Sequence, residues 1–332
     1  MPRARKKFVC RKKDRGVGLD VFLMGRIGSS RSQAQRLIKN NLVLLNAAPP
    51  KRARQALREN DVVEVICEPM REHSSRLYVG TKGKYEHTNY EKFDIKIIEE
   101  TDEYIVIDKP AGLLVHETGA GEKNTLADWL RDKYPEIQKV GESKLRPGIV
   151  HRLDKDASGV MVAAKTQKMF DHLKAQFKER AVEKKYLVLA HGVMEKDMGE
   201  INFAIDRGVS GRMSARPKID RTKLKNVNRE QPGKAAITEY LVKARFARFS
   251  LLEIKIHTGR THQIRVHLLA FAHPVVGDNL YFNRKLNRKK DKELGRLFLH
   301  ASELCFADLS GTKVCYNSGL PRELNDFLEK LN

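Results

Sequence analysis

The chain has 332 residues, which is enough for two or three domains, and its 41% hydrophobic content argues against wholesale disorder. Its formal net charge of +22 indicates a polyanionic partner, because basic side chains bind phosphates and release counterions. An anionic membrane is the alternative partner. The sequence has no long apolar run and no basic amphipathic anchor, so we expect nucleic acid and no membrane association.

The cysteines give little support for a metal site or a disulfide framework. The four cysteines are Cys10, Cys67, Cys305 and Cys315. They form no C-x-x-C pair, so a cysteine-based zinc site is not expected. Because the basic N-terminus lacks the apolar stretch of a secretory signal, we also expect no disulfide framework and a reducing, cytoplasmic compartment.

The N-terminal part of the chain predicts a basic arm followed by a small domain. We expect the arm over residues 1–18 and the domain over residues 19–68, with two helices followed by two strands. We expect Ser30 or Ser32 to cap the second helix. The candidate RNA contacts are the basic residues of the helix pair: Arg26, Arg31, Arg36 and Lys39. A solvated basic face is the alternative interpretation of these charges.

Residues 69–92 lack clear periodicity and predict a linker, and a larger α+β domain is expected over residues 93–332. The apolar runs predict its strands at 95–98, 104–107, 160–164, 185–190, 238–243 and 250–256. Helices are expected to open at Asn124 or Thr125, at Thr166 and at Thr261. The basic, Gly-rich stretch 206–234 is too irregular to assign.

The segment 147–159, PGIVHRLDKDASG, places a charged, turn-forming cluster directly before the buried strand expected at 160–164. Within it, Asp154 lies two residues from the fixed cation Arg152. Folded domains often keep their chemistry at the mouth of such a strand. The plainer interpretation is that Asp154 forms an Asx turn or pairs with Arg152.

This segment resembles the signature of the RluA/RluD family of RNA pseudouridine synthases. A second stretch, TGRTHQIRVHL at 258–268, is similar to that family's later motif, and HPVVGD at 273–278 continues the similarity. Residues 19–65 resemble the S4 RNA-binding domain that often precedes this catalytic domain. Together the similar segments span most of the chain, and both long motifs occur in the family's order.

The resemblance implies an α+β fold: a small S4-like α/β domain, then a catalytic domain with a large mixed, mainly antiparallel sheet flanked by helices. It implies isomerisation of uridine to pseudouridine in RNA without a metal or cofactor. Asp154 matches the family's catalytic aspartate, Tyr186 its active-site tyrosine and Arg265 the arginine that pairs with the aspartate. Arg152 matches an arginine that helps to hold the extruded nucleotide.

These residue types suit the implied reaction. The bond from C1′ to N1 must break, the uracil must turn, and C5 must bond to C1′. A carboxylate can attack C1′, or it can assist deprotonation at the ribose position next to C1′. An adjacent guanidinium keeps the carboxylate ionised. A tyrosine offers a stacking platform and a hydroxyl for the C5 proton, and flipping the uridine costs a few kcal/mol. Without the resemblance, we would interpret Tyr186 as a core residue and Arg265 as part of an exposed salt bridge.

Other features of the sequence bear on rival functions and on the substrate. His257, His262 and His267 recur every five residues, a spacing unsuited to a zinc site on a helix, so we interpret them as structural. Asp108 stands where many relatives carry Asn, and Glu117 interrupts a usual His-Pro-Gly stretch; both concern substrate choice. An RNA chaperone or assembly factor, and a metal-dependent RNA hydrolase, are the rival classes.

The S4-like unit ahead of the catalytic domain favours large-subunit (23S) ribosomal RNA over tRNA as the substrate. We expect the protein to act on this RNA, or on the assembling subunit, as a monomer.

Overall fold

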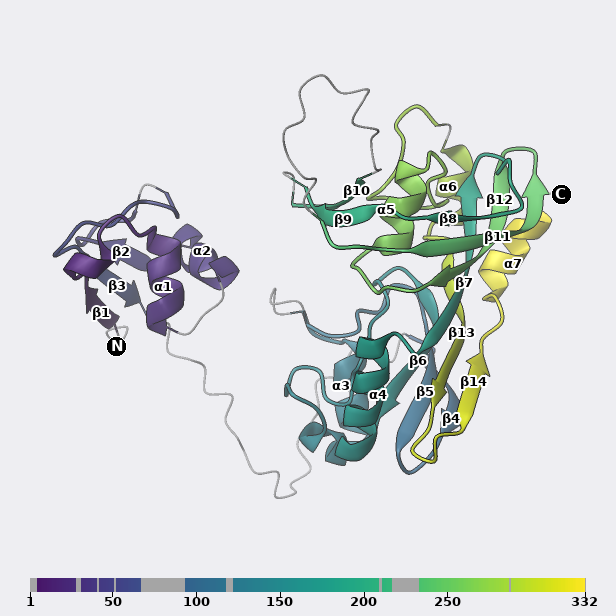
Figure 1. The fold of residues 1–332 in the computed structure, drawn as a ribbon, viewed down its shortest axis with the longest axis horizontal. Helices are drawn as coiled ribbons and strands as arrows, with labels where there is room; N and C mark the ends of the chain where they lie inside the picture. The colour runs from purple at the N-terminus through teal and green to yellow at the C-terminus, as the bar shows by residue number, and fades with distance from the viewer. Residues whose placement is uncertain are drawn as a thin grey trace. The chain divides into compact units, whose positions relative to one another are not determined.

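The computed structural model describes the chain apart from residues 1–4, 28–30, 41, 51, 67–92, 118–121, 209–210, 217–232, 287 and 332. The chain forms two compact units, residues 1–84 and residues 85–332 (Figure 1). The predicted linker, 69–92, lies outside the described residues. None of the helices in the described ranges is long and apolar enough to cross a membrane.

The smaller unit packs two helices against a three-stranded antiparallel sheet of order β1-β3-β2. Its elements are β1 (Arg5–Val9), η1 (Lys12–Asp14), α1 (Leu19–Ile27), α2 (Arg31–Lys39), β2 (Val43–Leu45) and β3 (Val62–Ile66). Its core joins α1 to the sheet through residues such as Leu23, Val43 and Val63, all fully buried. The two predicted helices and two predicted strands are therefore present.

The N-terminal residues differ from the expected basic arm. Residues 5–9 form β1, which pairs along its length with β3, and Cys10 is buried in the core of this unit. The basic residues of this segment gave no pattern that indicates a strand. The strand forms by hydrogen bonding to β3, which lies more than fifty residues later in the chain. Part of the segment assigned to the arm thus belongs to the folded domain.

The larger unit is built on a nine-stranded sheet of order β4-β5-β6-β13-β7-β12-β11-β8, with β14 paired to β13. Figure 1 shows the sheet running from β4 and β5 at one end to β11 and β8 at the other. The β6–β13 pair is parallel and the other pairs are antiparallel. The larger unit therefore has the expected architecture, a large mixed, mainly antiparallel sheet flanked by helices.

The strands of the larger unit are β4 (Lys96–Glu100), β5 (Tyr104–Lys109), β6 (Ser158–Ala164), β7 (Glu183–His191), β8 (Met198–Ile201), β9 (Ala204–Arg207), β10 (Met213–Arg216), β11 (Thr238–Phe246), β12 (Phe249–Ile256), β13 (Leu299–Ala307) and β14 (Lys313–Asn317). Its helices are α3 (Leu126–Lys133), η2 (Pro135–Lys139), α4 (Gln167–Glu179), α5 (Gln263–Ala270), α6 (Lys289–Leu294) and α7 (Arg322–Glu329). The predicted caps Thr125 and Thr166 accept hydrogen bonds from the third residues of α3 and α4.

Helices pack on the sheet and bury its apolar side chains. The α4 helix packs on β6 and β13 through Met169, Phe170 and Leu173, and α5 lies against β10 and β11. The α7 helix buries Leu324 and Phe327 in a separate cluster with residues of β7 and β12. The strand β6 is buried along its whole length, as its uninterrupted apolar sequence indicates.

Three local features depart from expectation. Part of the unassigned stretch 206–234 forms the β9–β10 hairpin, while residues 217–232 lie outside the described chain. The helix expected to open at Thr261 begins instead at Gln263, because His262 adopts a left-handed conformation with φ of 55°. Cys305 and Cys315 form a disulfide, since the β13–β14 register places them opposite each other; spacing along the chain gave no sign of this pair.

Gly159 is required where β6 meets β13. Its φ of +116° disfavours other residues, and an added Cβ would collide with the backbone of Ala301 on β13. We expect Gly159→Ala to destabilise the larger unit by about 3 kcal/mol, from strain and overpacking together. Urea unfolding followed by the fluorescence of Trp129, the single tryptophan of the chain, reports on this unit.

Gly311→Ala is the matched control, because Gly311 has a φ of +85° but nothing within 4 Å of an added Cβ. It should cost about 1 kcal/mol, from backbone strain alone. Equal unfolding midpoints for the two variants would contradict the close β6–β13 approach.

Candidate active site

The segment that carries Asp154 is anchored along the buried strand β6. The amide of Ala164 donates to the carbonyl of Gly148 at 2.9 Å, and the amide of Val162 donates to Nε2 of His151 at 3.1 Å. Burial, with a smaller contribution from the charge of Lys184, lowers the pKa of His151 to about 3. This histidine is therefore neutral and serves as a backbone acceptor that holds the loop on the sheet.

The far side of the loop is held by Lys109, a fully buried residue at the end of β5. Its Nζ donates to the carbonyls of Pro110, Leu113 and Lys155 at 2.8, 2.9 and 3.2 Å. Burial lowers the pKa of Lys109 to about 7. Because Lys155 directly follows Asp154, these contacts fix the backbone that presents the carboxylate.

Asp154 and Arg265 meet as the sequence predicted. Nη1 of Arg265, on α5, donates to Oδ2 of Asp154 at 2.9 Å. The Asp154 side chain is 16% exposed, so the carboxylate is reachable from solvent while its partner is nearly enclosed. In the described chain Asp154 forms no ion pair with Arg152, and the alternative interpretation based on that pair is not supported.

Arg265 is held in turn by Asp278, a residue whose role the sequence analysis left unassigned. Nε and Nη2 of Arg265 donate to the two carboxylate oxygens of Asp278 at 2.7 and 2.8 Å. Asp278 is fully buried and also accepts from the amides of Leu280 and Tyr281. Its place at the end of the similar segment 273–278 was the available signal, but no local rule revealed its partner.

The two carboxylates keep the guanidinium charged. Burial by itself disfavours the cation, but hydrogen bonds and negative charge from Asp278 and Asp154 outweigh it and raise the pKa of Arg265. Cζ of Arg265 also lies 5.0 Å from the centre of the Tyr281 ring. The arginine is therefore a fixed cation that leaves one nitrogen for Asp154.

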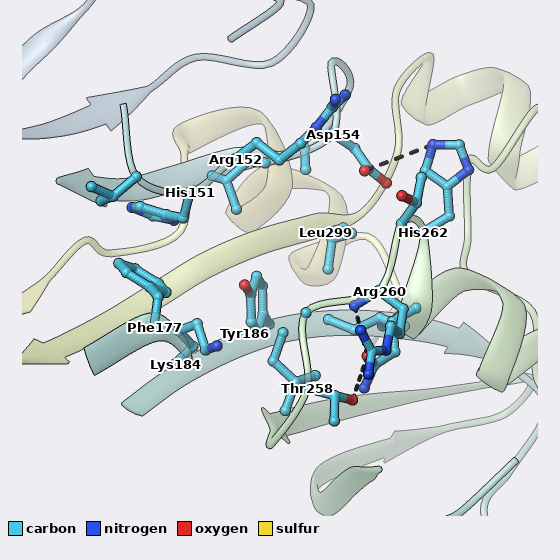
Figure 2. Close-up of a pocket in the computed structure, with 18 of the residues that line it drawn as sticks. His151, Arg152, Asp154, Phe177, Lys184, Tyr186, Thr258, Arg260, His262 and Leu299 are labelled. Carbon is cyan, nitrogen blue, oxygen red and sulfur yellow. Dashed lines mark hydrogen bonds and ion pairs between the residues drawn. The ribbon is translucent and has the colours of Figure 1, made fainter. Parts of the chain in front are cut away.

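His262, interpreted from sequence as structural, also belongs to the site. Its Nδ1 is 2.8 Å from the Tyr281 hydroxyl, and its Nε2 lies 3.8 Å from Oδ1 of Asp154 (Figure 2). Burial lowers the pKa of His262 despite the opposing charge of Asp154. His267 does fit the structural interpretation, since its ring bonds Thr238 and the carbonyl of Phe203.

Tyr186 lies in the same cavity, on β7. The side chain is buried yet lines the cavity below the segment of Arg152 and Asp154 (Figure 2). Burial and the negative charge of Asp154 raise the pKa of Tyr186, so its hydroxyl is neutral. The residue thus combines the core position expected from strand periodicity with a place in the site.

The cavity has a volume of about 540 Å³, and Arg152 lies on its rim as an exposed cation. Other basic side chains line it as well: Arg146, Lys178, Arg180, Lys184 and Arg260. Among the described residues, no group of three or more His, Cys, Asp or Glu side chains could hold a metal ion. The cavity presents one carboxylate amid cations, which suits an anionic substrate.

The predicted RNA contacts of the smaller unit have varied surroundings. Arg26 pairs with Asp14 at 2.9 Å and lies 5.0 Å from the ring centre of Phe22, so it is partly engaged within the unit. Lys39 is exposed near the end of α2. Arg31 and Arg36 lie on α2, and their side chains fall outside the described residues.

Comparison with known proteins identifies the family. A family model described as RNA pseudouridylate synthase matches residues 103–270, the range that holds Asp154, Tyr186 and Arg265. An uncharacterized RNA pseudouridine synthase of Aquifex aeolicus is 39% identical over 267 residues, covering 79% of this chain and 76% of the relative. The chain belongs to the RNA pseudouridylate synthase family. It is therefore an RNA pseudouridine synthase, an isomerase that modifies RNA.

Further relatives support the RluA/RluD branch of the family. Ribosomal large subunit pseudouridine synthase D of Nitrosomonas europaea is 36% identical over 262 residues, covering 78% of this chain and 71% of the relative. The structure of human RNA Pseudouridylate Synthase Domain Containing 4 shares 30% identity with a TM-score of 0.57, covering 71% of this chain and 92% of that one. The predicted family and enzyme class are thus confirmed.

The buried contact between Asp278 and Arg265 should matter for both stability and rate. We expect Asp278→Asn to destabilise the larger unit by about 3 kcal/mol, because it leaves part of a buried cation uncompensated. Pseudouridine formation should fall about 100-fold, because Arg265 is no longer held toward Asp154. Urea unfolding and single-turnover assays of pseudouridine formation in RNA measure the two effects.

Glu323→Gln is the control, because Glu323 pairs with Arg296 but is 54% exposed. Its effect should stay within about 0.5 kcal/mol. Wild-type stability and rate in the Asp278 variant would refute the positioning role of the buried pair.

Proposed function

We propose that this synthase isomerises uridines of large-subunit ribosomal RNA, with Asp154 as the nucleophile toward a flipped-out uridine. The observation that carries the proposal is the 2.9 Å contact between Arg265 and Asp154 at the wall of a cavity. A carboxylate held ionised by a buried guanidinium, yet open to the cavity, is poised to act on a bound sugar.

The reaction assigns one task to each group of the site. The Asp154 carboxylate acts on the ribose, by attack at C1′ or by assistance at the neighbouring position, while the C1′–N1 bond breaks. The electron pair of that bond leaves with the uracil. After the uracil turns, C5 bonds to C1′ and the carboxylate of Asp154 is released unchanged. The proton lost from C5 is replaced by one gained at N1, so the product is an isomer and needs no cofactor.

Tyr186 supports the intermediate stage, when the uracil is detached. Its ring lines the cavity and offers a stacking surface that limits diffusion of the base. Its neutral hydroxyl is the group that relays the C5 proton. Arg152, exposed on the rim, contacts the displaced backbone or fills the gap left in the helix.

The choice of large-subunit ribosomal RNA rests on relatives. Proteins named ribosomal large subunit pseudouridine synthase D align with 78% of the chain in Nitrosomonas europaea and with 91% in Haemophilus ducreyi, the latter at 31% identity. We extend this substrate to the present chain, as free rRNA or as part of an assembling subunit. We also propose, from the sequence expectations, that the protein acts in the cytoplasm and as a monomer.

The rival functions fit the site less well. Binding alone, as in an RNA chaperone or assembly factor, gives no reason to direct a carboxylate at a polyanion. Metal-dependent hydrolysis needs clustered ligands, and within the described ranges no such cluster of His, Cys, Asp and Glu is found.

Asp154→Asn should retain RNA affinity and abolish isomerisation, because the amide keeps the shape but cannot act as a nucleophile. Asp156→Asn, in the same loop and exposed, is the matched control and should retain activity. Pseudouridine in treated large-subunit rRNA is quantified together with RNA affinity. Wild-type product from the Asp154 variant would refute the nucleophile assignment.

We further propose that the smaller unit is an S4 RNA-binding domain. It has its own core, and so does the larger unit, so each has the means to fold separately. Deleting residues 1–68 should weaken capture of ribosomal RNA more than turnover on a short stem-loop. Filter binding and single-turnover rates measure the two properties, and equal losses in both would contradict a docking role.

A further inference from the structure

Lys184 is a cation inside the cavity that the mechanism above does not use. It lies two residues before Tyr186 on β7, and residues at that spacing on a strand point to the same face. Both side chains line the cavity, and Figure 2 shows the Lys184 nitrogen directed toward the side of Tyr186. Its Nζ also lies 5.6 Å from the centre of the Phe177 ring.

Other partly or fully buried lysines of the larger unit have partners for their ammonium groups. Lys109 donates to three carbonyls, and Lys165 binds Glu100 and the carbonyl of Thr101. Lys185, adjacent on β7, pairs with Glu303 at 2.9 Å. Within the part of the chain that the structure describes, Lys184 has neither a carboxylate within 4.0 Å nor a hydrogen-bond acceptor.

A half-buried cation without a counter-ion is unfavourable unless a ligand supplies the missing charge. Burial lowers the pKa of Lys184, and no nearby carboxylate opposes the effect. Besides burial, the positive charge of Lys184 lowers the pKa of His151, which is neutral. The free protein thus holds a cation on the cavity wall with no negative partner of its own, at a place that a bound substrate reaches.

The substrate of the proposed reaction supplies that partner. A uridine flipped into the cavity brings one phosphodiester on its 5′ side and one on its 3′ side, each with a full negative charge. A phosphate oxygen satisfies an ammonium better than a neutral uracil carbonyl does, because it adds the attraction of a full negative charge to the hydrogen bond that either oxygen can accept.

We propose that Lys184 binds a phosphate oxygen of a phosphodiester that adjoins the flipped uridine and so seats the nucleotide over Tyr186. This assignment rests on the proposed function. It adds an inner phosphate contact to the cations on the rim, and it makes β7 the strand that binds both the backbone and the base of one nucleotide.

The test uses a fluorescein-labelled stem-loop of large-subunit rRNA that contains a uridine converted by the wild-type protein. Lys184→Met should weaken binding about tenfold near 0.1 M salt. It should also make the slope of log affinity against log salt less steep by about one, because one phosphate contact is lost. Lys184→Arg should restore the slope, which shows that the charge and not the fold is responsible.

Lys185→Met is the matched control, since its ammonium pairs with Glu303 and it follows Lys184 on the opposite side of the strand. It should leave both affinity and salt slope unchanged. A Lys184→Met variant with the wild-type salt slope would overturn the inference, and a loss confined to the chemical rate would do the same by indicating contact with the uracil.

Replacing single phosphates in the stem-loop locates the contact. A neutral methylphosphonate on the 5′ or the 3′ side of the uridine should weaken wild-type binding at one of the two positions. At that position Lys184→Met should cause no further loss, because the partner is already neutral. Additive losses at both positions would overturn the assignment.

Failure of the proposed function gives a separate result. In that case wild-type protein would form no pseudouridine in any fragment of large-subunit rRNA. If only the Lys184 assignment fails, the wild-type protein still forms pseudouridine, and the Lys184→Met variant keeps the wild-type salt slope.

Discussion

The site depends on a buried arginine that lies between two carboxylates. Arg265 binds Asp278 through two nitrogens and Asp154 through a third, and its side chain is only 7% exposed. An unpaired cation at this depth would be strongly destabilising, so Asp278 makes the placement of Arg265 possible. The remaining nitrogen then sets the direction of Asp154. Catalytic geometry and local stability are therefore coupled through one side chain.

The fold brings these charges together from three segments. Asp154 lies in the loop before β6, Arg265 on α5, and Asp278 in the turn after that helix. The loop is fixed to the sheet by His151 and to the end of β5 by Lys109, both of which bind backbone atoms. Some ionisable residues near the Asp154 carboxylate thus hold the loop in place through backbone contacts.

Local sequence patterns predicted much of the larger unit. Thr125 and Thr166 begin the predicted helices because capping is decided within one turn of the chain. The strand at 160–164 followed from its continuous apolar run. Asp154, Tyr186 and Arg265 were found through the family resemblance, and the structure brings all three to one cavity.

What the sequence did not predict depends on contacts between distant segments. The strand β1 exists through pairing with β3, and the Cys305–Cys315 disulfide through the register of β13 and β14. Asp278 and His262 acquire their roles only when the turn after α5 and the left-handed start of that helix bring them to Arg265 and Asp154. Neither hydrophobic periodicity nor a helix-capping pattern in the sequence predicts these long-range contacts.

The most direct test of the account is a structure of the Asp154→Asn variant bound to a large-subunit rRNA stem-loop. We expect a uridine turned out of the RNA into the cavity, with its base against Tyr186 and its C1′ within about 3.5 Å of the side chain at position 154. A uridine that remains stacked in the RNA, or that binds with its ribose away from position 154, would contradict it.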